Sequence, residues 1–136
     1  MDFHNLLQNL KNQSFFSNLV IERGIEKESL RVTKNGYISN KKHPETLGSS
    51  YTNPSITTDF AESLIEIVTP TYTNVDELYE KLKIIHVFIN QNLKDGEMLW
   101  PFSMPPKIED ESKINIATYG KTNMGRLKHV YRKGLA

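Results

Sequence analysis

The clearest structural signal in this sequence is a stripe of apolar residues in its second half. The stripe advances in steps of three and four residues, through Val75, Leu78, Leu82, Ile85, Ile89 and Leu93. This spacing predicts an amphipathic helix from Val75 to about Leu93. Asn74 is a suitable N-cap, and Asp76 and Glu77 in the first turn favour the positive end of the helix dipole. Any fold for this chain must therefore include a helix here.

Two strands are predicted before this helix. The first passes through Arg31 and Val32 to Asn35-Gly36, the strongest short hairpin signal because both residues tolerate positive φ, and Tyr37-Ile38 follows. Residues 40 to 55 are rich in Lys, Pro, Gly, Ser and Asn and are typical of a loop. The second strand runs from about 61 to 68 and stops at Thr69-Pro70. A helix after antiparallel strands indicates an α+β domain.

Three further segments complete the expected organisation. Phe3, Leu6, Leu7 and Leu10 predict a short helix over residues 2 to about 12, which we expect to serve packing. The prolines within residues 98 to 106 exclude regular helix, so we expect an extended crossover with Trp100 and Phe102 packed on the core. The basic last segment has helical periodicity at Leu127 and Val130.

Composition limits the possible functions. The 136 residues include 17 basic and 16 acidic side chains, so the net charge of +1 gives no global signal for binding a polyanion. The absence of cysteine excludes disulfides, thiolate metal sites and a Cys nucleophile, and it fits a reducing compartment. Neither a signal peptide nor a membrane-spanning stretch is recognisable, so we expect a cytoplasmic protein with no membrane partner.

The pattern that points to chemistry is a set of four carboxylates in two short segments. Glu26 and Glu28 stand two residues apart, so in a strand both side chains point to the same side. Glu66 lies inside an apolar run, where an uncompensated carboxylate would be costly to bury, and Asp59 precedes it. A hard divalent cation such as Mg²⁺ would satisfy all four groups. The alternative is a salt-bridged sheet surface with Lys27 and Arg31 as partners.

Other motifs give weaker signals. Gly120-Lys121-Thr122 resembles the end of a phosphate-binding loop, but Asn115 stands where that loop requires glycine, so we reject this interpretation. His86 lies beside the apolar stripe and is interpreted as a structural histidine. The basic residues near the C-terminus could contact phosphate or form a solvated helix face, and they are Lys121, Arg126, Lys128, Arg132 and Lys133.

Five segments, taken in order, closely resemble the N-terminal part of bacterial glutamate–cysteine ligase, also called γ-glutamylcysteine synthetase. They are Arg23–Val32, His43–Ser49, Ile56–Glu62, Met98–Pro105 and Tyr119–Arg126. The resemblance implies a mainly antiparallel sheet with flanking helices, as the N-terminal part of a glutamate–cysteine ligase and glutamine synthetase-like catalytic fold. It also implies that residues 1–136 are an incomplete N-terminal portion of one catalytic domain.

The resemblance implies an activity and a set of ligands. The family joins the γ-carboxylate of glutamate to cysteine at the expense of ATP, through an acyl phosphate, in the first step of glutathione synthesis. By this similarity Glu26, Glu28, Asp59 and Glu66 would bind Mg²⁺. Phe60 and Tyr131 would line a cysteine pocket, and Arg132 would pair with a substrate carboxylate.

The expected partners are therefore glutamate, cysteine and ATP, with no nucleic acid. Family members continue far beyond residue 136, so we expect the chain alone to be inactive. Two alternatives remain open at this point. One is a non-catalytic Mg²⁺–nucleotide binding module, and the other is a small nucleic-acid binding domain that uses the basic C-terminal segment.

Overall fold

A computed structural model describes residues 2–13 and 15–134, with the side chains of Asn18, Lys128, Arg132 and Lys133 outside the description. The helices are α1 (Phe3–Asn12), α2 (Val75–Asn92) and α3 (Asn123–Lys133). The strands are β1 (Glu26–Val32), β2 (Ile56–Thr58), β3 (Leu64–Val68) and β4 (Met98–Leu99). Short 3₁₀ turns lie at Phe15–Asn18, Glu45–Leu47 and Glu111–Lys113. The predicted α+β class, with a mainly antiparallel sheet and flanking helices, is confirmed.

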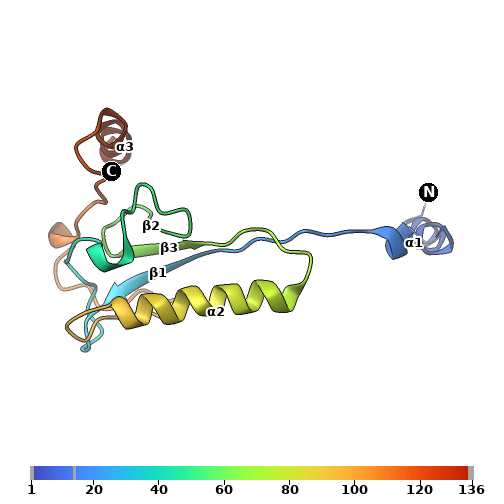
Figure 1. Ribbon diagram of the computed structural model, residues 1–136, viewed down its shortest axis with the longest axis horizontal. Coiled ribbons are helices and arrows are strands. Elements are labelled where there is room, and N and C mark those ends of the chain that lie inside the picture. The colour runs from blue at the N-terminus through green and yellow to red at the C-terminus, as the bar shows by residue number, and fades with distance from the viewer. Residues whose placement is uncertain (1, 14, 135–136) are drawn as a thin grey trace.

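The four strands of the described chain form one antiparallel sheet in the order β2-β3-β1-β4. α2 runs alongside the sheet in Figure 1. Its buried face packs on one side of the sheet, in a core made of Leu47, Ile56, Ile65, Ile67, Ile85 and Ile89. Because side chains alternate along a strand, this core uses only one face of β2 and β3. No helix of the described residues covers the opposite face of the sheet, which we call the uncovered face.

The predicted helix and its cap are confirmed. α2 begins at Val75 and ends at Asn92, and the Asn74 side chain accepts a hydrogen bond from the Asp76 amide at 2.8 Å. His86 lies half-buried against its own helix, with Nδ1 2.9 Å from the Leu82 carbonyl oxygen. That contact supports the interpretation of His86 as a structural residue.

The turn after β1 forms where Asn35-Gly36 predicted it. The Thr33 amide donates to the Tyr37 carbonyl, and Gly36 adopts a φ of 78°. The glycine of the pair alone has positive φ, which is enough to turn the chain. The returning chain pairs with β1 through one isolated bridge, Val32 with Ile38, and Tyr37 forms another with Lys107. No regular strand forms at these residues.

Two packing expectations were wrong. No residue of α1 is buried, and Figure 1 shows this helix at the end of an extended segment, away from the sheet. Phe102 is 60% exposed, so it does not enter the core. It packs instead on Trp100, with ring centroids 5.0 Å apart, while the Trp100 indole donates to the Met104 carbonyl.

The predicted strand from 61 to 68 is β3, which begins later, at Leu64. β2 was not predicted. It is three residues long, follows the Asn53-Pro54 turn and pairs with β3 through Ile56 opposite Ile67 and Thr58 opposite Ile65. This short strand matters because the turn between β2 and β3 begins with Asp59.

Candidate active site

Three of the four predicted carboxylates share the uncovered face of the sheet. Glu28 of β1 lies directly opposite Glu66 of β3, which in turn lies opposite Thr57 of β2. Glu26 is two residues from Glu28 and therefore on the same face. Ile65 and Ile67, the neighbours of Glu66, point into the core on the other face. The apolar run therefore buries its alternate residues and presents Glu66 away from the core.

Asp59 extends this arrangement to the end of β2. Its amide donates to the Leu64 carbonyl at 3.2 Å, which continues the β2–β3 ladder by one residue pair. Asp59 is thus two residues beyond Thr57, at a position that shares the face of Glu66. Asp59 and Glu66 are half-buried, whereas Glu26 and Glu28 are exposed. All four carboxylates occupy positions on one side of one small sheet.

The alternative interpretation, in which Lys27 and Arg31 form salt bridges with these carboxylates, is wrong. Lys27 and Arg31 have the opposite alternation from Glu26 and Glu28, so they point to the covered side of the sheet. Lys27 donates to the Ser29 hydroxyl, and burial lowers its pKa. Arg31 forms an ion pair with Glu97 at 2.9 Å. Neither cation neutralises the carboxylate face.

A hollow of about 350 Å³ adjoins the carboxylates. Glu28 forms part of its wall, together with Leu30, Leu64, Trp100 and Met104. The indole and the aliphatic side chains make the remaining wall largely apolar. The carboxylate face therefore has an adjacent space in which a small molecule could lie beside Glu28.

Phe60 and Tyr131 are both accessible. Phe60 follows Asp59 in the β2–β3 turn and is 41% exposed, and Tyr131 on α3 is 70% exposed. The Arg132 side chain lies outside the described part of the chain. α3 stands at the opposite end of the molecule from α1 in Figure 1. The described residues thus present two aromatic surfaces that remain open to a ligand.

Comparison with known protein families identifies the family of the chain that carries this arrangement. The family model described as glutamate–cysteine ligase matches residues 5–136. This chain belongs to the glutamate–cysteine ligase family. The resemblance drawn from the five segments is thereby confirmed.

Relatives of this chain show how much of the family's length it spans. It is 52% identical over 116 residues to the glutamate–cysteine ligase of Hahella chejuensis, a match that covers 85% of this chain and 22% of the relative. The Francisella tularensis glutamate–cysteine ligase, solved in complex with AMP, superposes with a TM-score of 0.80 at 40% identity. That match covers 84% of this chain and 23% of the other.

A bifunctional glutathione synthetase from Pasteurella multocida also has this fold, with a TM-score of 0.77 at 31% identity over 94% of this chain and 16% of that one. The chain thus spans about a fifth of the length of the relatives it matches. Among the described residues, no helix combines the length and apolarity needed to cross a membrane.

This chain supplies oxygen donors of the type that Mg²⁺ prefers, but its described residues do not form a closed metal site. Glu28 and Glu66 face each other in register, and carboxylate oxygens suit a hard cation. Within residues 2–13 and 15–134, no three His, Asp or Glu side chains converge closely enough to hold a metal ion. The donor chemistry of this sheet face fits Mg²⁺.

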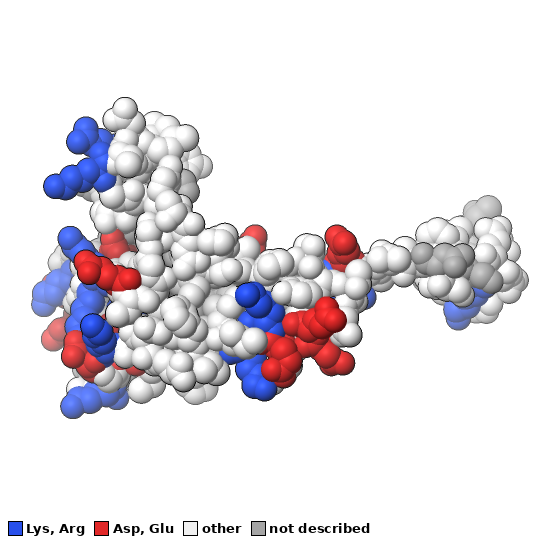
Figure 2. All heavy atoms as spheres, in the orientation of Figure 1, with Lys and Arg blue, Asp and Glu red and all other residues white. Residues whose placement is uncertain are grey.

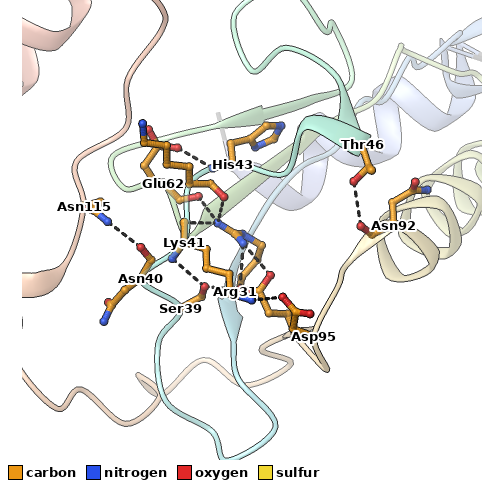
Figure 3. A network of polar contacts seen from close by, with 12 residues as sticks. Arg31, Ser39, Asn40, Lys41, His43, Thr46, Glu62, Asn92, Asp95 and Asn115 are labelled. Atoms are coloured by element: carbon orange, nitrogen blue, oxygen red, sulfur yellow. Dashed lines mark hydrogen bonds and ion pairs between the residues drawn. The ribbon is translucent and has the colours of Figure 1, made fainter.

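A buried polar network that the sequence analysis missed supports the end of this sheet (Figure 3). The Arg31 side chain has no exposed surface. Its Nη1 donates to both carboxylate oxygens of Glu97, at 3.1 and 2.9 Å, and its Nη2 donates to the carbonyls of Lys41, Lys42 and Glu62. Burial lowers the pKa of Arg31, and Glu97 opposes this effect. One signal in the sequence could have revealed this network. Arg31 falls on the opposite side of β1 from Glu26 and Glu28, which is the side that faces the core.

Glu62 is the second buried charge that was missed, with only 4% of the residue exposed. Its Oε1 accepts hydrogen bonds from the Thr118 amide and hydroxyl, and its Oε2 accepts one from the His43 amide. Burial and the Arg31 guanidinium lower the pKa of His43, while Glu62 opposes them. These contacts join the β2–β3 turn to two segments distant in sequence.

Proposed function

We propose that this chain forms the N-terminal part of a Mg²⁺-dependent glutamate–cysteine ligase and supplies part of its metal site. The observation that carries the proposal is the placement of Glu26, Glu28 and Glu66 on one uncovered sheet face, with Asp59 at its end. Family membership supports the same activity. AMP bound to the Francisella tularensis relative supports a nucleotide as one ligand of the complete enzyme.

The proposed reaction is an ATP-driven amide synthesis. The γ-carboxylate oxygen of glutamate attacks the γ-phosphorus of ATP, and ADP leaves. The cysteine amine then attacks the acyl phosphate carbon, an amide bond forms and inorganic phosphate leaves. When bound, Mg²⁺ would neutralise the crowded phosphate oxygens and the charge that develops during phosphoryl transfer. Glu26, Glu28, Asp59 and Glu66 would hold it through their carboxylate oxygens.

The remaining site residues would bind the amino-acid substrates. Phe60 and Tyr131 present exposed aromatic rings, which suit the small thiol side chain of cysteine. Arg132 would bind a substrate carboxylate through the two nitrogens of its guanidinium. None of these residues needs to exchange a proton, since positioning and charge neutralisation account for their contribution.

The basic C-terminal segment gives the nucleic-acid alternative little support. Arg126 of α3 is exposed. Figure 2 shows acidic and basic side chains interspersed over much of that end of the visible face. The family match extends through α3 to residue 136. We therefore assign α3 to substrate binding in the ligase.

The test is a chimera in which residues of this chain replace the matching segment of the Hahella chejuensis ligase, with which they share 52% identity. We expect the purified chimera to form γ-glutamylcysteine from glutamate, cysteine, ATP and Mg²⁺. The 136-residue chain alone should form none, because β2 and β4 remain open sheet edges and the described residues bring no three metal-binding side chains together. A folded but inactive chimera, or an active isolated chain, would contradict the proposal.

A further inference from the structure

The turn that presents Asp59 and Phe60 is held along its length by one distant segment, residues 115–119. The Glu62 amide donates to the Asn115 carbonyl at 2.8 Å, and the Ala117 amide donates to the Phe60 carbonyl at 2.9 Å. The Tyr119 hydroxyl lies 2.7 Å from the Thr58 carbonyl oxygen and 3.2 Å from that of Asp59. We call residues 115–119 the clamp segment. The clamp segment therefore contacts the turn at several points along its length.

The Glu62 carboxylate locks this clamp segment in place. Both Thr118 donors, the amide at 2.9 Å and the hydroxyl at 2.7 Å, point to Oε1. The other oxygen accepts from the His43 amide at 2.8 Å, which fixes the loop after β1 to the same point. A carboxylate can accept from both sides at once, whereas a carboxamide has a single acceptor oxygen. Both oxygens of the Glu62 side chain are therefore needed as acceptors for this geometry.

The clamp segment leads directly into α3. Gly120, with a φ of 77°, turns the chain, and the Thr122 hydroxyl accepts from the Gly125 amide at 3.1 Å at the start of the helix. Gly125 lies so close to the Tyr119 and Gly120 carbonyls that a Cβ there would be 2.3 Å from the Tyr119 oxygen. The start of α3 is thus fixed to the clamp segment, and through it to the turn that carries Phe60.

From this continuity we infer that Glu62 is a positioning residue of the cysteine site, which sets the placement of Phe60 on the turn relative to Tyr131 on α3. The inference rests on the proposed function, because Phe60 and Tyr131 are assigned to the cysteine site only by that proposal. Glu62 itself does not contact substrate. Its carboxylate is buried and is already engaged by His43 and Thr118.

The assignment is specific to the amino-acid acceptor. Loss of the Glu62 contacts would loosen the turn against α3 and separate the two aromatic walls of the cysteine pocket. The carboxylates of β1 and β3 are held by the central sheet ladder, which does not include Glu62. Asp59 is held to β3 by its own amide, which donates to the Leu64 carbonyl at 3.2 Å. Cysteine binding should therefore suffer more than nucleotide binding. A purely structural role would instead reduce folding stability and active fraction without selecting one substrate.

The experiment uses the ligase chimera and compares Glu62→Gln with Thr118→Val, Thr118→Ser and the surface control Glu80→Gln. We expect Glu62→Gln to raise the KM for cysteine about tenfold and to leave the KM for ATP within about twofold, since misplaced binding groups act on the substrate they contact. Thr118→Val should act in the same direction, and Thr118→Ser, which keeps the hydroxyl, should restore the parent value. Amide exchange at His43 and Thr118, measured without substrates, should accelerate in Glu62→Gln.

The outcomes separate this inference from the proposed function. A parent chimera that makes no γ-glutamylcysteine would overturn the proposed function and, with it, the assignment of Glu62 to the cysteine site. An active parent in which Glu62→Gln leaves the KM for cysteine unchanged would overturn the role of Glu62 alone. Equal rises in all KM values, or a fall in kcat that merely tracks lost stability, would also overturn it. If Glu62→Gln fails to fold, Thr118→Val and Thr118→Ser decide by the same criteria.

Discussion

Glu28 on β1 and Glu66 on β3 are direct cross-strand neighbours on the uncovered face of the sheet. Side chains directly opposite in an antiparallel pair have Cβ atoms roughly 4.5 to 5.5 Å apart. Two like charges at this spacing weaken the sheet unless a cation lies near both. The pair brings two potential oxygen ligands to one point of this face, and this placement has measurable consequences.

Neutralising Glu28 should stabilise the protein in the absence of metal. We expect Glu28→Gln to raise the free energy of unfolding by about 0.2 to 1 kcal/mol, because it removes like-charge repulsion across the strands. Urea denaturation of the chimera in EDTA measures this. The control is Glu80→Gln, which removes a carboxylate from an exposed pair with Lys83 and should change stability little. A loss of stability in Glu28→Gln would show that the cross-strand carboxylates are not repelling each other.

Arg31 should be the most sensitive charged residue for folding. We expect Arg31→Met to lower the free energy of unfolding by about 3 to 5 kcal/mol, because Glu97 would remain buried without its cation. Arg31→Lys should cost less but remain destabilising, since an ammonium cannot reach Glu97 and the loop carbonyls as a guanidinium does. Lys83→Met, which breaks an exposed ion pair, is the matched control. Equal costs for Arg31→Met and Lys83→Met would contradict the network.

His43 should make stability depend on pH. Burial, reinforced by Arg31, holds its folded-state pKa below the unfolded value of 6.5. Below pH 6.5 the unfolded chain binds the proton more readily than the folded one, so stability falls with decreasing pH. The contribution is fully present above 6.5 and is lost as the pH falls through the folded-state pKa. Urea denaturation of His43→Gln between pH 5 and 8 should show a shallower dependence than the parent, and identical slopes would refute this cause.

Gly125→Ala should loosen the start of α3. Within a helix, replacement of glycine by alanine usually stabilises by roughly 0.5 to 1 kcal/mol, but here the new Cβ would collide with the carbonyls of Tyr119 and Gly120. We expect faster amide exchange over residues 120–126 and a raised KM for cysteine in the chimera. At Gly134 the nearest atom to a Cβ is 3.4 Å away, so Gly134→Ala is the control. Unchanged exchange in Gly125→Ala would contradict the close contact.

Local patterns were sufficient to predict α2 and part of the carboxylate face. The apolar stripe and the Asn74 cap lie within one continuous segment, so the limits of that helix could be read from it. Alternation alone placed Glu26 and Glu28 on one side of a strand. The register that brings Glu28 opposite Glu66 could not be read in this way, because it depends on pairing between segments 38 residues apart along the chain.

The missed features share a dependence on long-range contacts. β2 has three residues, too few for periodicity to reveal, and it exists because β3 offers a partner. The partner of Arg31 is 66 residues away at Glu97, and the partner of Glu62 is 56 residues away at Thr118. Phe102 was expected in the core on account of its apolarity, yet single exposed aromatics are common on protein surfaces.

The most direct test of the central claim is the Mg²⁺ dependence of γ-glutamylcysteine synthesis by the chimera. The assay compares the parent with Glu28→Gln, Glu66→Gln and the surface control Glu80→Gln. If the uncovered sheet face holds Mg²⁺, the first two variants should need at least about tenfold more Mg²⁺ for half-maximal rate, since even loss of groups that only support metal ligands costs 10- to 100-fold in affinity. Glu80→Gln should match the parent. Parent-like Mg²⁺ curves for both Glu28→Gln and Glu66→Gln would contradict the account.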